Sequence, residues 1–375
     1  MSPRVVIPLG SLHLSGGVKV LVLIANAMAS DGWRVTFIVP DYAAHSPFPL
    51  DSGIRVLVLS TGPSRSPQWF HKTLYYLKLS WNAAWDADLC LANYYLTAYC
   101  AFFCRFLRRT KTKIFWYIQG YEAGSHGLLA DAGPISRFTR YVMARLSYSL
   151  PIPVFCVSNW VKNQIGRTDA QVIHPPALDL QTFSPQGRQE TKRDTIVIGT
   201  IGRQGETKGY GDFLRALEKL PDLRGIRVLV ASPIPGEVSL PRGVSAEAVC
   251  AQSPQAMADF YRRCDIFILS SRMEGFPLPG LEAMACGCAL LTTACGGISE
   301  YVIEESNALV VPTRSPQELA DSLWQLCQNH LLRQQLSREG QNTAQRFGQE
   351  AMVAHFIQRM WAIIPAMQSS TFDIM

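Results

Sequence analysis

Short apolar runs alternate with helical patterns along the whole chain, and this alternation most limits the fold. Each run is too short for a buried helix, and helical periodicity fills the stretches between them, such as Gly17–Asp31 and Thr97–Arg108. Strands separated by helices form βαβ units, which build parallel sheets. In the first half of the chain the predicted strands are Arg4–Pro8, Val35–Val39, Arg55–Leu59, Leu89–Ala92, Ile114–Ile118 and Pro153–Val157.

The pattern restarts after Asp179–Asp194, a polar segment with Pro and Gly that we interpret as an interdomain linker. A length of 375 residues agrees, since it corresponds to about 2.5 domains. We predict an α/β protein with two Rossmann-like domains, at residues 1–180 and 195–345, and a crossing helix with a tail at 346–375. The second set of strands is Thr195–Thr200, Arg227–Ala231, Ile266–Ser270, Ala289–Thr292 and Leu309–Val311.

Composition excludes several classes of protein. Hydrophobic residues make up 48% and charged residues 17%, which is too apolar for a disordered chain. The net charge of +6 fits an anionic ligand or membrane surface, but without a long Lys/Arg block it does not indicate nucleic acid. We find no signal peptide and no apolar run of about 18 residues, and the ten cysteines lack metal-ligand spacing. These features predict a cytoplasmic protein without zinc.

Two basic residues flank a glycine-containing loop in IGTIGRQGETKGYGDF, residues 198–213. A predicted strand ends at Gly202, and Arg203 and Lys208 then precede a helix. Two cations near a helix start suit a diphosphate, through charge pairing and the helix dipole. The loop is not a P-loop, because Gly209 follows Lys208. The alternative is a pair of solvated surface charges.

A glycine pair, Gly16-Gly17, lies between the first strand and the first helix. Glycines allow a ligand to approach the backbone, and a helix start offers free N–H groups to an anion. An ordinary strand–helix turn explains the pair equally well.

Two glutamates eight residues apart form the most informative motif, in SSRMEGFPLPGLEAMACG at residues 270–287. Pro279 suits the first position of a helix, which would place Glu282 in the first turn and Glu274 in the preceding loop. A carboxylate in such a place can accept hydrogen bonds from the vicinal hydroxyls of a sugar or ribose. The alternative is a capping acid and an exposed loop acid.

This segment resembles the E-x7-E motif of retaining glycosyltransferases, in particular glycosyltransferase family 4. Similarity covers most of the chain and is closest to bacterial surface-polysaccharide transferases of the rhamnosyl and mannosyl type. The other similar segments are SGGVKV at 15–20, FCVSNWVKNQI at 155–165, VIHPPALDLQTFSP at 172–185, the pair Arg203 and Lys208, GGISE at 296–300 and NALVVP at 307–312.

The resemblance implies a GT-B fold, in which two Rossmann-like domains face each other across a cleft. The second domain would bind a nucleotide-diphosphate sugar, with Glu282 on the ribose and Glu274 on the hydroxyls of the donor sugar. Arg203 and Lys208 would neutralise the departing diphosphate, with no metal or cofactor required. The implied catalytic set is Glu274, Arg203 and Lys208, and the implied donor-binding set is Gly16, Gly17, Gly202, Phe276, Pro277, Leu278 and Glu282.

The acceptor side departs from the family, many of whose members carry a His just after the strand at Ile114–Ile118. This chain has Tyr117-Ile-Gln119-Gly-Tyr121-Glu122 there. The acceptor-side candidates are therefore Gln119, Tyr121, Glu122 and His126, although a lone loop His is commonly a surface residue. We interpret Asp86-Ala-Asp88, which has D-x-D spacing, as a structural turn.

Residues 69–107 are dense in aromatics and are followed by basic residues up to Lys113. This composition suits either a buried core or a peripheral interface with anionic lipid, in which case the acceptor would be lipid-linked. The function implied is retaining transfer of a sugar to a glycan or lipid-linked hydroxyl, in polysaccharide biosynthesis. The open alternatives are a nucleotide-sugar epimerase or a phosphorylase on the same fold, and a non-catalytic nucleotide-sugar binding protein.

Overall fold

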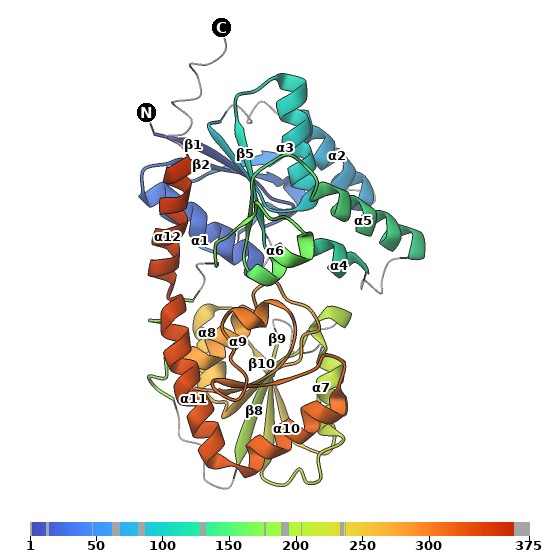
Figure 1. Cartoon of the computed structure of the whole chain (residues 1–375), viewed down its shortest axis with the longest axis vertical. Coiled ribbons are helices and arrows are strands. Elements are labelled where there is room, and N and C mark those ends of the chain that lie inside the picture. Colours follow the sequence, from blue (N-terminus) through green and yellow to red (C-terminus); the bar gives the residue numbers. More distant parts are fainter. Residues whose placement is uncertain are drawn as a thin grey trace. The chain divides into compact units, whose positions relative to one another are not determined.

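The computed structural model contains two compact α/β units (Figure 1). It describes residues 2–12, 15–46, 48–61, 68–81, 87–127, 133–175, 178–188, 195–203, 205–232, 236 and 238–363. Each unit holds one parallel sheet with helices on its faces, so the predicted fold class is confirmed. Unit 1 comprises Met1–Gly127, Pro134–Ala177 and Glu350–Met375, and unit 2 comprises Leu128–Gly133 and Leu178–Gln349.

The sheet of unit 1 has the strand order β3-β2-β1-β4-β5-β6-β7, and all its pairs are parallel. Parallel strands end at the same edge, so the loops that follow β1, β4, β5 and β6 share that edge. The strands are β1 Arg4–Pro8, β2 Arg34–Pro40, β3 Arg55–Leu59, β4 Leu89–Ala92, β5 Lys113–Ile118, β6 Val154–Cys156 and β7 Gln171–Val172. The helices are α1 Gly16–Ser30, α2 Gln68–Trp81, α3 Tyr95–Arg108, α4 Glu122–Gly127, α5 Pro134–Ser147, α6 Asn159–Ile165 and α12 Gln349–Ile363.

The sheet of unit 2 has the order β10-β9-β8-β11-β12-β13 and is also wholly parallel. The loops after β8 and β11 are therefore neighbours, and so are those after β11 and β12. The strands are β8 Ile196–Ile201, β9 Ile226–Ser232, β10 Ser245–Cys250, β11 Ile266–Leu269, β12 Ala289–Thr293 and β13 Ala308–Val311. The helices are α7 Tyr210–Leu217, α8 Pro254–Arg262, α9 Leu278–Ala285, α10 Pro316–Gln328 and α11 His330–Ala344.

Strand β10 was not predicted, because its sequence SAEAVC has no apolar run. It pairs with β9 at the edge of the sheet, where Glu247 forms ion pairs with Arg227 and with Arg263, the latter at 2.8 Å. Backbone pairing and charge thus hold a strand that hydrophobicity alone would not indicate.

The first part of the predicted linker, residues 179–188, is packed on unit 2. Phe183 is buried with its ring 6.2 Å from that of Tyr261, and Arg262 donates to the carbonyl oxygens of Thr182 at 2.6 Å and Ser184 at 3.0 Å. One buried aromatic is too little to produce an apolar period, so the segment has a polar pattern although it is anchored. The rest of the predicted linker, residues 189–194, lies outside the described residues.

Nine of the ten cysteines are buried and all ten are free, in agreement with a packing role. Among the described residues, no helix has the length and apolarity that crossing a membrane requires.

Helix α12 belongs to unit 1, where its apolar face packs. Phe356 and Met360 are almost fully buried, and the ring of Phe356 contacts that of Tyr117 edge-on at 5.5 Å. Near the helix end, Trp361 meets Trp33 at 4.8 Å.

Replacing Phe356 should therefore destabilise unit 1. We expect Phe356→Ala to lower the free energy of unfolding by about 3–5 kcal/mol, because it leaves a cavity against β5. Chemical denaturation measures this change. Gln358→Ala, at an exposed position of the same helix, is the control. Equal stability of the two variants would contradict the packing of α12 described above.

Candidate active site at the carboxyl ends of the strands

The loops after β8 and β11 are bound to each other. The backbone N–H of Arg272 donates to the carbonyl oxygen of Thr207 at 2.8 Å. Gly209 has a φ of +61°, and a Cβ there would lie 1.9 Å from the carbonyl oxygen of Ser270. Only glycine allows both this conformation and this close approach. The glycine-containing loop is therefore fixed directly beside the Glu274 loop.

Lys208 and Glu274 form an ion pair across these two loops. Lys208 Nζ lies 2.7 Å from Glu274 Oε1, and the Ser271 hydroxyl donates to the same oxygen at 2.7 Å. The two side chains are 33% and 18% exposed, so the pair is half-buried and open to a ligand. Within the described part of the chain, Glu274 Oε2 has no hydrogen-bond partner. One carboxylate oxygen is thus held while the other can accept a ligand hydroxyl.

The loop after β12 holds the other side of Glu274. The Glu274 N–H donates to the Cys295 carbonyl oxygen at 2.7 Å, and the Gly297 N–H donates to the Glu274 carbonyl oxygen at 2.9 Å. A Cβ on Gly297 would lie 1.9 Å from the Gly275 carbonyl oxygen. The loop after β12 therefore fixes the backbone of Glu274, while Lys208 of the loop after β8 holds its side chain.

The buried carboxylate of Asp212 holds the loop of Glu274 through Arg272. Asp212 is 2% exposed and accepts from Arg272 Nε at 2.9 Å and Nη2 at 3.2 Å, and it also pairs with Arg215. Burial raises the pKa of Asp212, but the two guanidinium groups outweigh it and hold the pKa below its ordinary value. Neither Asp212 nor Arg272 was singled out from the sequence. The two residues are 60 positions apart in the sequence, so no local pattern indicates their contact.

Glu282 is placed differently from the prediction. Helix α9 begins at Leu278, so Pro279 is the second helical residue and Glu282 lies in the second turn, not the first. The carboxylate is buried at 8% exposure, and the Tyr261 hydroxyl of α8 donates to its Oε2 at 3.2 Å. Glu282 is therefore neither a first-turn acid nor a helix cap, which also excludes the capping alternative.

The segment 276–278 is packed in the protein interior and does not extend into solvent. Phe276 and Leu278 are each 9% exposed, and the Leu278 N–H donates to the Phe276 carbonyl oxygen at 3.0 Å. The Pro277 carbonyl oxygen accepts from the Tyr301 hydroxyl at 2.5 Å. This segment supports the start of α9, and its contribution to a donor stays a prediction.

Gly202 and Arg203 follow β8 and lie in different environments. A Cβ on Gly202 would lie 2.5 Å from the Val230 side chain and 2.6 Å from that of Val238, so packing by itself requires glycine there. Arg203 is exposed, and its side chain has no partner within the described residues. In the structure Lys208 forms an ion pair with Glu274. The predicted contact of Arg203 and Lys208 with a diphosphate stays a prediction.

In unit 1, two predicted site segments meet at the carboxyl edge of the sheet. Ser15 caps α1 by accepting from the Val18 N–H at 3.2 Å, which places Gly16 and Gly17 in the first turn. Gln119, which follows β5, donates from Nε2 to the Gly17 carbonyl oxygen at 3.2 Å.

Glu122 connects α4 to α3. Its Oε2 accepts from the Tyr95 N–H at 2.9 Å, and burial raises the pKa of Glu122 from 4.5 to about 8. The ring of Tyr121 contacts those of Tyr148 and Trp160 at 6.3 and 6.4 Å. His126 belongs to α4, but its side chain lies outside the described residues.

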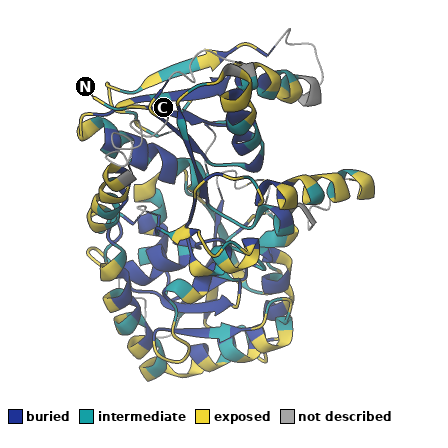
Figure 2. Ribbon diagram, turned by 45° about the horizontal axis from the view of Figure 1, so that its top comes forward, coloured by how far each residue is buried: buried dark blue, intermediate teal, exposed yellow. Residues whose placement is uncertain are grey.

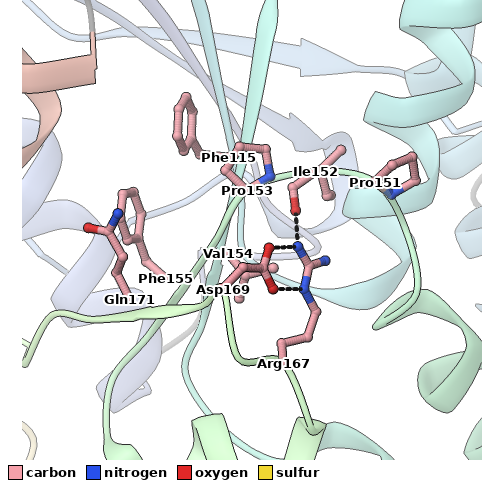
Figure 3. Close-up of a pocket in the computed structure, with 9 residues that line it drawn as sticks. All are labelled: Phe115, Pro151, Ile152, Pro153, Val154, Phe155, Arg167, Asp169 and Gln171. Carbon is pink, nitrogen blue, oxygen red and sulfur yellow. Dashed lines mark hydrogen bonds and ion pairs between the residues drawn. The ribbon is translucent and has the colours of Figure 1, made fainter.

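Asp88 and a separate pocket lie at the opposite edge of this sheet. Asp88 accepts from the Arg4 N–H at 2.8 Å just before β4, and Asp86 lies outside the described residues. A cavity of ≈ 330 Å³ opens near the starts of β5, β6 and β7 (Figure 3). Its Arg167 is bound to Asp169 and to the carbonyl oxygens of Leu150 at 2.8 Å and Ile152 at 3.0 Å. The charges of this pocket are thus satisfied structurally.

The family that matches this chain does so within unit 2. Residues 184–343 match the model of the family described as "Glycosyl transferases group 1". This segment includes Lys208, Glu274 and Glu282. The chain is also 31% identical over 202 residues to the D-inositol 3-phosphate glycosyltransferase of Saccharomonospora viridis, covering 48% of this chain and 47% of that one. The chain spans half the length, or less, of the first such relatives.

Solved structures match nearly the whole chain. Sucrose-phosphate synthase from Thermosynechococcus elongatus has a TM-score of 0.81 at 18% identity, over 97% of this chain and 100% of that chain. Anabaena HepE in complex with UDP-glucose has a TM-score of 0.70 at 17% identity, over 96% and 100%. The fold is GT-B. At these identities the likeness concerns the fold alone.

The glycine contacts give a test of how the site is built. Gly297→Ala should lower the free energy of unfolding by about 1–3 kcal/mol, because the new Cβ collides with the Gly275 carbonyl. Denaturant titration measures it. Gly211→Ala is the control, since a Cβ there meets nothing within 4 Å. A Gly297→Ala variant as stable as the control would contradict the contact.

Glu122 makes a prediction about pH. Because its pKa is raised in the folded state, its contribution to stability is complete below pH 4.5 and is lost as pH rises towards about 8. Glu122→Gln cannot ionise and still accepts from Tyr95, so its melting temperature should exceed that of the wild type increasingly over this range. Thermal melts at several pH values measure the difference. Glu218→Gln, at an exposed site, should show a constant difference, and a constant difference for Glu122→Gln would refute the prediction.

Proposed function

We propose that this chain transfers a sugar from a nucleotide-diphosphate sugar to a hydroxyl acceptor. The observation that carries the proposal is the half-open Lys208–Glu274 pair at the carboxyl edge of the unit 2 sheet. That pair lies inside the segment that matches group 1 glycosyl transferases. Ligands of α/β folds bind at this edge.

The two glutamates take the donor in different ways. Glu274 Oε1 stays with Lys208 and Ser271, while Oε2 accepts a hydroxyl of the donor sugar. Glu282, oriented by the Tyr261 hydroxyl, accepts from the ribose. A nucleotide-sugar donor is supported by the likeness in fold to Anabaena HepE, whose solved complex contains UDP-glucose.

The cations act on the leaving group. As the sugar–phosphate bond breaks, negative charge grows on the diphosphate and positive charge grows on the sugar ring. Lys208, held in place by Glu274, and the exposed Arg203 stabilise the diphosphate, and fixed charges do so without reorganising. Because these side chains supply the positive charge, the proposed reaction needs no metal ion. The transfer retains the configuration of the anomeric carbon.

The acceptor is a glycan or lipid-linked saccharide hydroxyl, by resemblance to surface-polysaccharide transferases of the rhamnosyl and mannosyl type. Gln119, Tyr121 and Glu122 are its candidate contacts in unit 1, because they follow β5 at the carboxyl edge of that sheet.

A ligand panel identifies the donor. The melting temperature of the purified chain is measured with UDP-, GDP-, dTDP- and ADP-sugars in turn. The ligand that binds most tightly should raise it most. Product analysis by NMR should then show a retained anomeric centre, and activity should persist with EDTA. Inversion, or a strict need for a divalent metal, would contradict the mechanism. A rearranged sugar or a sugar 1-phosphate would contradict transfer itself.

Substitution of Lys208 tests the assignment of the site. We expect Lys208→Ala to lower kcat by about 10²–10³-fold, because the leaving diphosphate loses a fixed cation. Initial rates of transfer measure it. Lys219→Ala removes an exposed lysine of the same unit and should leave the rate unchanged. Unchanged kinetics for Lys208→Ala would refute the role of the pair.

A further inference from the structure

Helix α5 exposes its apolar face, which a helix packed on a core would bury. Ile135, Phe138 and Leu146 lie at spacings of three and eight residues on one face and are 84%, 68% and 58% exposed. Its buried residues are instead Ala144 and Ser147. Figure 1 shows α5 extending away from the sheet of unit 1, and Figure 2 shows exposed residues along it. The apolar stripe is therefore not used to hold unit 1 together.

The last turns of α3 also expose apolar side chains. Phe103, Phe106 and Leu107 are 50%, 75% and 55% exposed. The two helices are in contact, since the Tyr99 hydroxyl of α3 donates to the Met143 carbonyl oxygen of α5 at 2.9 Å. We call these six exposed apolar residues of α3 and α5 the α3–α5 face. Such a concentration of exposed apolar side chains on one unit marks an interaction surface.

The charged residues of α3 and α5 themselves have one sign. The sequence contains no Asp or Glu from Leu89 to Tyr121 or from Gly133 to Thr168. Arg105 and Arg109 at the end of α3 and Arg140 in α5 are exposed and form no ion pair within the described residues. Exposed cations on two helices that carry no acidic residue attract an anionic partner.

We propose that the α3–α5 face docks on an anionic lipid surface. Aromatic and aliphatic tips enter the boundary between headgroups and acyl chains, while the arginines pair with lipid phosphates. A second copy of the chain is disfavoured as occupant, because a self-complementary contact would bring the same unpaired arginines together. The proposal goes beyond sugar transfer and does not depend on it.

Vesicle flotation of the full chain, without donor or acceptor, tests the proposal. The chain should bind phosphatidylcholine vesicles that contain phosphatidylglycerol, and bind pure phosphatidylcholine weakly. The triple variant Ile135→Ser, Phe138→Ser, Leu146→Ser should lower the partition coefficient by at least about tenfold. Arg105→Gln with Arg140→Gln should lower it by roughly fivefold per arginine, an effect that salt also produces.

Matched variants separate docking from folding. Leu331→Ser with Ile303→Ser removes side chains that are 75% and 61% exposed on unit 2, and it should bind vesicles like the wild type. Phe138→Trp should retain or strengthen binding, since tryptophan favours the interface. All variants should keep the wild-type melting temperature. Equal binding to neutral vesicles, undiminished binding of the triple variant, or a wild-type dimer that the triple variant converts to monomers would overturn the proposal.

Discussion

The ion pair between Lys208 and Glu274 is the interaction on which the candidate site depends. It joins the loops after two neighbouring strands, and it holds a cation and a carboxylate where both remain partly open to solvent. Gly209 and Gly297 let the flanking backbones approach closely enough for the pair to form. The same contact thus orders the loops and positions the two charges that the proposed chemistry requires.

The fold could be predicted from sequence wherever hydrophobicity has a local period. The predicted strands at Arg4–Pro8, Arg55–Leu59 and Leu89–Ala92 are confirmed to the residue, and the other predicted strands agree to within one residue at each end. Strand β10 was not predicted, because backbone pairing and ion pairs hold it in the sheet instead of apolar residues. Helix α5 was not among the helices named from the sequence, although the spacing of its apolar residues is helical.

The site could be predicted only in part. Spacing singled out Lys208, Glu274 and Glu282, but it did not indicate the ion pair between Lys208 and Glu274, and it began the helix of Glu282 one residue too late. Contacts across 60 residues or more, such as those of Arg272 with Asp212 and of Lys208 with Glu274, leave no local trace in one sequence. The raised pKa of Glu122 has the same origin, because burial by other elements causes it.

A double-mutant cycle tests the central claim, that Lys208 and Glu274 act as one unit. Transfer rates are measured for the wild type, Lys208→Ala, Glu274→Gln and the double variant. If Glu274 works by holding Lys208 and the donor together, the double variant should be about as slow as the slower single variant. Losses that simply multiply would show that the two side chains act independently, and would contradict the account.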